Sequence, residues 1–522
     1  MEIRRQYSIH EIDQREGDLQ MAVAMDKLYI ITDKKYGEGF IHYYFNEKLW
    51  INAGKNVRVH FNSSNNIALI GIAWSVLDGE TPYEQIDSIA IDCDKDVVID
   101  KISFWCGKFT LLIGNTIYTD AFCMQGCFYS QYAVSNHFGL LSRYLDLQIK
   151  YPKNVYGAMC IDFFPGPDTT AMEIKRLMSS QIFTFGKGVE QRRLLTDHEN
   201  EDSNIDIEKR FIHAFTNSLK NMRKALEGEF YVALTGGHDS RTLLAGLDYC
   251  DIECKCFTME NSTISCADRN IPTQLAQKLG MDYIFIKQDR NRFNRKKHKE
   301  FMEFNSGYVV DQDINYYSYG QYDKLLEFND DKKMVVLRSG LWEAVVAWYL
   351  YGNKLSDDLE LRYSDILARG GVLRKDIDKC VSLKKYFDYV DKNPEKGITA
   401  VDRFLWEQRE GAWLSDIEGS YNIYDKIESI QPLNSAYLIW LLLQFDFDDR
   451  IVKKHQEKLI KYLSSDLSEI PYDVHKGEKA VVRKLRNGVE KYIKLFCKCG
   501  LTYANCFIMD KVVRCFQDYS HR

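Results

Sequence analysis

The chain has no long apolar run. None of its uninterrupted apolar stretches approaches the roughly 18 residues that a membrane-spanning helix needs. The longest apolar block, residues 436–443, is predicted to form a buried helix instead. Residues 1–6, MEIRRQ, do not contain the apolar core of a secretion signal. We therefore expect a cytoplasmic protein with no membrane partner.

Cysteine motifs for metal or redox chemistry are also missing. The sequence has 14 cysteines, but none of its close pairs has the two-residue spacing of a zinc ribbon or a redox site. Several lie in apolar, strand-like runs, so buried and reduced thiols are expected. The close pairs are Cys123 with Cys127, Cys254 with Cys256, and Cys497 with Cys499.

An excess of positive charge is absent. The net charge is −6, and the 33 tyrosines and 28 phenylalanines do not alternate regularly with basic residues. A groove for single-stranded nucleic acid is therefore not indicated, and we do not expect a nucleic-acid partner. The strongest basic run, residues 290–299, is predicted to be a solvated helix face; contact with RNA or a phosphate-bearing ligand is the alternative.

The chain is long enough for two domains of different character. The first ~185 residues contain short β-like runs, such as 28–31, 57–61, 67–71 and 109–113, separated by turn residues. This pattern predicts an antiparallel, sandwich-like domain. The polar, acidic stretch 196–206 has the composition of a linker. We place the domains at residues 1–195 and 205–522.

Strands and helices alternate after the linker. Helical periodicity covers residues 207–226, and the apolar run 232–234 reads as a buried strand. Alternation of this kind predicts a parallel sheet with helices on both faces, and hence an α/β fold. Further strands are predicted at 254–259, 283–286 and 334–337, and further helices at 268–279 and 342–350.

One short stretch carries most of the functional information. The buried strand ends in Thr235-Gly236-Gly237, and Asp239 and Ser240 follow at the start of an apolar helix. In a strand–turn–helix, backbone N–H groups and the helix N-terminus converge on an anion. The glycines allow close approach of a phosphate, and the two hydroxyls add donors. A carboxylate beside that anion indicates a Mg²⁺ ion between them.

This stretch resembles the Ser-Gly-Gly-x-Asp-Ser pyrophosphate loop of the N-type ATP pyrophosphatases, which include the asparagine synthetases. Threonine replaces serine at the first position, Thr235. Enzymes of this group cleave ATP to AMP and pyrophosphate and activate a substrate as its adenylate. The resemblance implies ATP and Mg²⁺ as cofactors. In such folds adenine lies against strand edges, here Ala233-Leu234 and Phe257-Thr258-Met259.

The N-terminal part resembles the glutamine-hydrolysing domain of asparagine synthetases. The similar segments are residues 104–113, 117–121, 127–130 and 133–135. The resemblance implies an Ntn-hydrolase-like αββα sandwich. That family uses a cysteine directly after the initiator methionine, whereas residue 2 here is Glu2 and the first cysteine is Cys93. We therefore expect a degenerate domain that does not hydrolyse glutamine, as in β-lactam synthetases and lasso peptide cyclases.

A second segment, residues 338–349, resembles the family sequence S-G-E-G-x-D-E-x-F-G-G-Y. Glu343 aligns with a magnesium-binding carboxylate, and Ser339 and Gly340 fall in the nucleotide-binding part. Gly340 stands where asparagine synthetase has a glutamate of the acyl-transfer step. Leu341 and Trp342 occupy positions that are small or polar in the family.

Three basic residues further along are candidates for catalysis. Arg409 could contact a substrate carboxylate or a phosphate, since its fork suits both, although a structural ion pair fits equally well. Lys476 and Lys479 fall in the region where the family has a lysine that steadies the adenylate or the tetrahedral intermediate. Solvated lysines in a loop are the alternative for both.

The sequence thus predicts an ATP-dependent, adenylate-forming ligase. The partners would be a small-molecule or peptide carboxylate and an amine, and a homodimer is left open. With the glutaminase lost, the amine would be ammonia or an amino group of a substrate. Two alternatives stay open: an RNA-modifying ATP pyrophosphatase, and a catalytically silent, nucleotide-binding scaffold.

Overall fold

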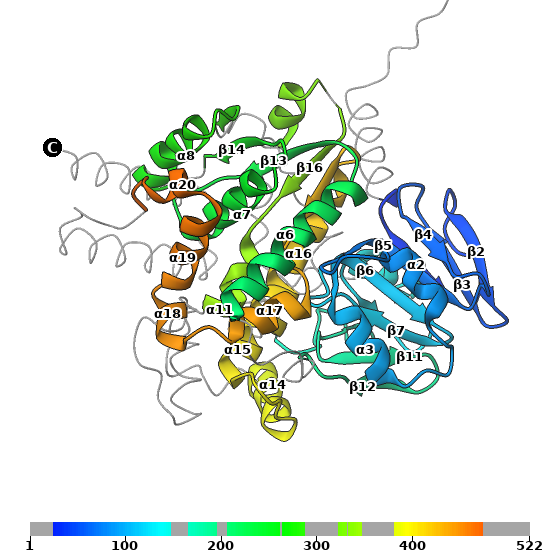
Figure 1. Ribbon diagram of the computed structural model, residues 1–522. Helices are drawn as coiled ribbons and strands as arrows, with labels where there is room; N and C mark the ends of the chain where they lie inside the picture. The colour runs from blue at the N-terminus through cyan, green and yellow to red at the C-terminus, as the bar shows by residue number, and fades with distance from the viewer. Residues whose placement is uncertain are drawn as a thin grey trace, which may run out of the picture.

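The computed structural model describes residues 25–147, 165–195, 206–260, 264–287, 322–330, 332–346 and 381–472. Within these ranges the chain forms two antiparallel sheets and one parallel sheet, so the fold is mixed α/β (Figure 1). No helix in these ranges combines the length and the apolar character needed to cross a membrane. The predicted basic run at 290–299 and the residues Glu2, Lys476 and Lys479 lie outside the described residues.

The N-terminal part consists of two six-stranded antiparallel sheets. In spatial order, the first contains β10 (Lys175–Arg176), β8 (Phe128–Tyr129), β9 (Val134–Ser135), β1 (Tyr29–Thr32), β3 (Leu49–Ala53) and β2 (Ile41–Asn46). The second contains β12 (Gly188–Gln191), β11 (Gln181–Thr184), β7 (Thr116–Thr119), β6 (Trp105–Ile113), β5 (Ile67–Ser75) and β4 (Val59–Phe61).

The two antiparallel sheets stack on each other. Ile31 and Ile51 of the first sheet and Ile70 and Leu112 of the second belong to one fully buried core. The other face of the second sheet packs against helices α2 (Pro82–Gln85) and α3 (Lys95–Ser103), with η1 (Ile86–Ser88) between them. Helix α4 (Phe138–Tyr144) contacts β8 and β9. The predicted sandwich is therefore present, and β5 is buried throughout because both of its faces are covered.

A five-stranded parallel sheet forms the centre of the C-terminal part. Its order is β15 (Tyr283–Ile286), β14 (Lys255–Met259), β13 (Glu229–Ala233), β16 (Met334–Leu337) and β17 (Ile427–Ile430), and every neighbouring pair is parallel. The chain order reverses between β13 and β16. In open α/β sheets, ligands bind outside the carboxyl ends of the strands at such a reversal. This topology places both predicted site segments, which follow β13 and β16, at that point.

Helices cover this sheet and continue the chain beyond it (Figure 1). The helices predicted at 207–226, 268–279 and 436–443 are confirmed within one or two residues. The helices are α6 (Ile207–Ala225), α7 (His238–Tyr249), α8 (Cys266–Lys278), α11 (Glu343–Val346), α14 (Val381–Lys392), α15 (Ala400–Phe404), α16 (Ser415–Ser420), α17 (Ala436–Leu443), α18 (Phe447–Ile451), α19 (Lys454–Leu463) and α20 (Ser465–Ser468). The described residues also form two short 3₁₀ helices, η3 (Gly340–Trp342) and η6 (Tyr421–Ile423), and one π-helix, η5 (Leu405–Leu414).

The sandwich and the parallel-sheet part share one apolar core. Trp74 and Phe122 of the sandwich cluster with Phe215 and Trp406, and the rings of Phe122 and Trp406 stack with centroids 4.9 Å apart. Trp74 Nε1 donates a 2.9 Å hydrogen bond to Ser218 Oγ. The linker at 196–205 lies outside the described residues, so the division into residues 1–195 and 205–522 stays a prediction.

The described cysteines are all free thiols, as expected. Cys106, Cys123, Cys127 and Cys256 are buried, and burial raises the pKa of Cys106 to about 12. A thiol with so high a pKa carries almost no thiolate at neutral pH, so these cysteines act as small apolar residues.

Glu395 connects the end of the sandwich segment to the helical part and should make stability depend on pH. Its carboxylate accepts hydrogen bonds from the N–H groups of Leu194 and Leu195, the latter at 2.7 Å. Burial raises the pKa of Glu395 from 4.5 to about 7. Because the folded state holds this proton more tightly, the stabilisation is complete below pH 4.5 and is lost as pH rises to about 7.

We expect Glu395→Gln to remove this pH dependence, which amounts to about 3 kcal/mol at most. Thermal melting of the variant and the wild type between pH 4.5 and 7.5 measures it. The wild-type melting temperature should fall relative to that of the variant as pH rises. A constant difference across this range would contradict the assignment.

Candidate nucleotide-binding site

The predicted phosphate loop lies between β13 and α7. Helix α7 begins at His238, and its N-cap residue is Gly237, which has no side chain that could cap the helix. The N–H groups of the first helical turn therefore stay available to an anion, and the helix dipole favours negative charge there. Gly236 lies against α8, where a Cβ atom would approach Ala267 O to 3.3 Å. A glycine at this position lets the turn pass close to the helix.

Hydrogen bonds fix the shape of this loop. Ser240 Oγ accepts from the Thr235 N–H at 3.0 Å and lies 3.0 Å from Thr235 Oγ1. The Gly236 N–H donates to Asp268 Oδ1 at 2.8 Å, and Asp268 is held in turn by Ser265 at the start of α8. Asp268 was not predicted. Its signal is the pattern Ser-x-x-Asp at residues 265–268, which is typical of a helix N-terminus.

Asp239 projects from the first turn of α7 and is already paired with a cation. Lys453 Nζ lies 2.9 Å from Asp239 Oδ1, and Gln456 Nε2 donates to the same oxygen at 2.9 Å. Lys453 precedes α19 and has a left-handed backbone with φ 60°, a conformation that costs a residue other than glycine about 1 kcal/mol or more. Sequence reasoning did not identify Lys453, because 214 positions separate it from Asp239.

A second group of charges surrounds Glu343, the first residue of α11. Arg409 forms a 3.4 Å ion pair with Glu343, and its guanidinium lies 3.4 Å from the ring centroid of Trp413. The adjacent Glu410 is 1% exposed, and its Oε1 has no hydrogen-bond partner among the described residues. Burial raises the pKa of Glu410 well above its usual range, and the charges of Glu343 and Asp239 raise it further. The three carboxylates therefore share one electrostatic neighbourhood.

Arg409 and Glu410 lie on the π-helical segment η5. Each π-helical turn contains an additional residue, so side chains emerge at angles that a 3.6-residue period does not predict. Glu410 was therefore missed, although it lies next to the predicted Arg409. π-Helical turns occur frequently at functional sites.

The chain segment after α20 is anchored beside the phosphate loop. The rings of Tyr472 and His238 stack with centroids 4.1 Å apart and an interplanar angle of 4°. Arg241, which is fully buried on α7, donates to the carbonyls of Ile470 at 2.6 Å and Pro471 at 2.9 Å. The segment that leads to Lys476 and Lys479 is thereby held at α7, while both lysines lie outside the described residues.

The residues predicted to surround adenine lie at the carboxyl ends of β13 and β14. Leu234 and Phe257 are buried, and the Leu234 N–H donates to Phe257 O at 2.8 Å. Thr258 Oγ1 donates to Leu234 O at 2.7 Å, whereas Ala233 and Met259 are half-buried. The Phe257 ring belongs to the core, so it could present only its backbone to a ligand. The adenine site stays a prediction.

Ser339 and Gly340 follow β16 at the same end of the sheet. The Gly340 N–H donates to Gln431 Oε1 at 3.1 Å, and a Cβ atom on Gly340 would lie 2.9 Å from Leu414. A side chain at this position would therefore require Leu414 of η5 to shift. The catalytic glutamate found at this point in asparagine synthetases could not be accommodated here without a shift of Leu414.

The carboxylates of Asp239 and Glu343 suit Mg²⁺, because both are hard oxygen donors whose side chains are about one-quarter exposed. Each now faces a cation of the protein, Lys453 or Arg409. In the described residues no cluster of three or more His, Cys, Asp or Glu side chains is arranged to hold a metal alone. Magnesium would therefore need oxygens of a bound polyphosphate to complete its coordination.

Comparison with known proteins adds little to this description. No known protein family profile matches the chain, and no curated protein matches it. Among solved structures, the NMN synthetase from Francisella tularensis matches at 12% sequence identity over 39% of this chain and 93% of that chain, with a TM-score of 0.20. A TM-score this low supports no conclusion about fold or activity, so the site is interpreted from its own residues.

Proposed function

We propose that the chain binds ATP on residues 235–240 and activates a carboxylate as its AMP ester, with release of pyrophosphate, for amide formation without glutamine. The observation that carries this proposal is the uncapped start of α7, with Asp239, Glu343 and Glu410 around it. N–H groups and hydroxyls would bind the polyphosphate. The proposal also rests on the resemblance of this loop to that of the ATP pyrophosphatases.

Asp239 and Glu343 would hold Mg²⁺ in this proposal. When bound, the ion would neutralise charge on the polyphosphate as pyrophosphate leaves. Lys453, now on Asp239, would turn to a phosphate oxygen, because an ammonium forms strong charge-assisted hydrogen bonds to phosphate. Arg409, which now pairs with Glu343, would contact a substrate carboxylate or phosphate.

Glu410 is the candidate base for the second step. Burial raises the pKa of its carboxyl, whereas the charge of Arg409 favours the ionised form, which is the form that would accept a proton from the attacking amine. Glu410→Gln should then retain pyrophosphate exchange into ATP, which needs only the first step, and lose amide formation. Equal loss of both would assign Glu410 to the fold or to ATP binding instead.

The general test is isotope exchange between pyrophosphate and ATP in the presence of pools of carboxylic acids. Exchange that depends on one acid would establish adenylation and identify the substrate class. Absence of exchange with every pool, combined with tight nucleotide binding, would favour the silent scaffold. Asp239 pairs with Lys453 and Glu343 pairs with Arg409, and this pairing is the observation that favours the scaffold as a second candidate function.

We expect Glu343→Gln to raise the Mg²⁺ concentration needed for ATP turnover by roughly tenfold or more, since a carboxylate ligand is replaced by a neutral amide. Nucleotide binding should change much less. A magnesium titration of turnover measures the effect, with Glu229→Gln, at the opposite end of β13, as the matched control. A wild-type magnesium titration in Glu343→Gln would exclude this carboxylate from the site.

Glutamine should not be hydrolysed. Residue 2 is a glutamate, and the cysteines of the described sandwich residues are buried except for Cys93. We propose that the sandwich is a degenerate, Ntn-hydrolase-like domain without its nucleophile. Incubation of the purified protein with glutamine, with and without ATP, should release no glutamate. Release that saturates with glutamine would indicate another nucleophile and overturn this reading of the domain.

A further inference from the structure

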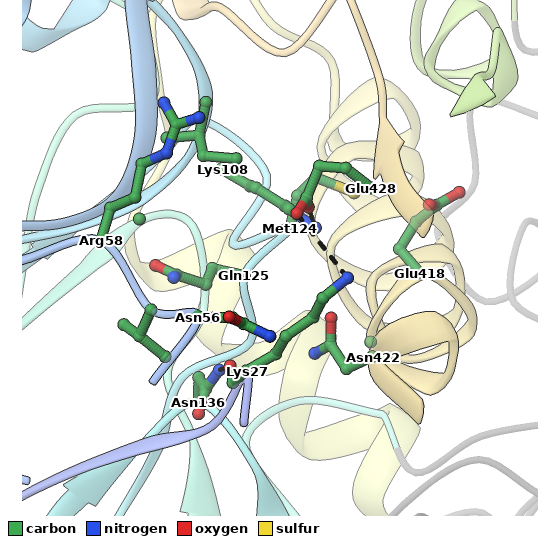
Figure 2. Close-up of a pocket in the computed structure, with 14 residues that line it drawn as sticks. Lys27, Asn56, Arg58, Lys108, Met124, Gln125, Asn136, Glu418, Asn422 and Glu428 are labelled. Carbon is green, nitrogen blue, oxygen red and sulfur yellow. Dashed lines mark hydrogen bonds and ion pairs between the residues drawn. The ribbon is translucent and has the colours of Figure 1, made fainter. Parts of the chain in front are cut away.

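A cavity of about 340 Å³ lies at the opposite end of the parallel sheet from the nucleotide loop. The turns that precede β13, β16 and β17 form one wall, and the sandwich forms the other. Its lining includes Lys27, Arg58, Ile72, Leu226, Lys333 and Glu428. The volume falls in the range of small-molecule sites, about 300–1,000 Å³. A narrower recess continues toward Lys108 and Gln125 (Figure 2).

The inner part of the cavity has more positive than negative groups. Lys27 and Lys108 both form ion pairs with Glu428. The exposed fraction of the side chain is 9% for Lys27, 15% for Lys108 and 14% for Glu428. Figure 2 shows Lys27 reaching from the sandwich toward Glu428 on β17. Arg58 adds a third cation and donates one hydrogen bond, of 3.0 Å, to the carbonyl of Ala225. Three cations therefore face one carboxylate.

The other acidic groups do not offset this excess. Glu418, at the edge of the recess, pairs with Arg338 at 3.3 Å and accepts hydrogen bonds from Ser429 and Gln431. Glu227 and Asp425 are exposed at the rim, where Lys333 and Lys426 are also exposed. Burial lowers the pKa of Lys27, the charge of Glu428 opposes this shift, and the charge of Lys108 adds to it.

We propose that this cavity binds a small ligand through carboxylate or phosphate oxygens, with Arg58 and Lys333 as the principal contacts. Lys27, Lys108 and Arg58 outnumber the single carboxylate of Glu428 that they face, and an anion would offset this excess of positive charge. The guanidinium fork matches either kind of oxyanion. Lys333 is exposed at the rim, so its ammonium group can reach a ligand in the cavity. Such a ligand would touch both the sandwich and the parallel sheet.

Isothermal titration of the full chain with citrate and with inorganic phosphate tests this site, with potassium chloride at equal ionic strength as the blank. We expect saturable binding of at least one anion, and the preferred anion identifies carboxylate or phosphate as the recognised group. Arg58→Gln should weaken binding about tenfold or more, since one well-formed charged contact corresponds to roughly 1.4 kcal/mol or more. Lys333→Gln, at an exposed position, should weaken it several-fold.

Two controls separate this site from others. Lys55→Gln removes an exposed lysine of the sandwich that pairs with Asp26 at 2.7 Å, and it should leave binding unchanged. Ser240→Ala alters the nucleotide loop and should leave citrate binding unchanged. Absence of saturable binding for both anions would overturn the proposal. Binding lost in Ser240→Ala but kept in Arg58→Gln and Lys333→Gln would also do so, and would place the anion on the nucleotide loop.

Discussion

Replacing Asp239 by asparagine is expected to abolish ATP turnover while the protein stays folded. Asparagine keeps the size of the side chain but loses the charge that would hold Mg²⁺ at the polyphosphate. Loss of a metal ligand and of its charge stabilisation should lower the rate on the order of 10³-fold. Binding of a non-hydrolysable ATP analogue should become weaker and nearly independent of magnesium. Titration calorimetry with and without Mg²⁺, together with pyrophosphate release, measures both effects.

The folded state should tolerate this change. The ion pair between Asp239 and Lys453 is partly exposed, at 24% and 20% of the two side chains, so its contribution to stability is about 1 kcal/mol or less. The melting temperature should therefore change by a few degrees at most. Asp449→Asn, which removes a carboxylate paired with Lys454 and Lys458 outside the loop, is the matched control. A folded Asp239→Asn protein with normal turnover would remove this loop from the mechanism.

The second large effect is expected for Lys453→Met. If Lys453 competes with Mg²⁺ for Asp239 and contacts the phosphate once ATP is bound, its loss should make turnover slower but make magnesium binding tighter. Turnover should fall on the order of 100-fold, because a charge-assisted contact to the polyphosphate is lost. The magnesium concentration for half-maximal turnover should also fall, because the competing ammonium group is gone. A purely structural lysine would not lower the magnesium requirement.

Lys454→Met is the matched control for this experiment. Lys454 is the next residue, its side chain is 58% exposed, and it pairs with Asp449 rather than with the loop. It should retain both wild-type turnover and the wild-type magnesium titration. Lys453→Gly removes the same side chain and relieves the left-handed backbone, so it should remain folded and match Lys453→Met in turnover. A higher magnesium requirement in either Lys453 variant would contradict the proposed competition.

Local sequence patterns predicted the strands and helices that frame the site. The strands at 283–286 and 334–337 and the helix at 436–443 have the predicted bounds. The strand at 334–337 and the helix at 436–443 are mostly buried, and in all three segments the limits of the apolar run coincide with the limits of the element. The helix predicted from residue 342 begins instead as a 3₁₀ turn at Gly340. Packing of Gly340 against Leu414 accompanies this irregular start, and a local pattern does not contain that contact.

The sequence by itself determined the turn at residues 235–240, which we propose binds phosphate. The Gly-Gly turn, the apolar strand before it and the apolar helix after it are local, and local geometry requires these residues. Tertiary structure alone decided what surrounds the loop. Lys453 lies 214 positions after Asp239, and Glu410 lies 171 positions after it, yet both are close to the loop in space. Only the order of the parallel strands and the π-helical turn of η5 bring these charges together, because electrostatic interaction depends on distance in space and not along the chain.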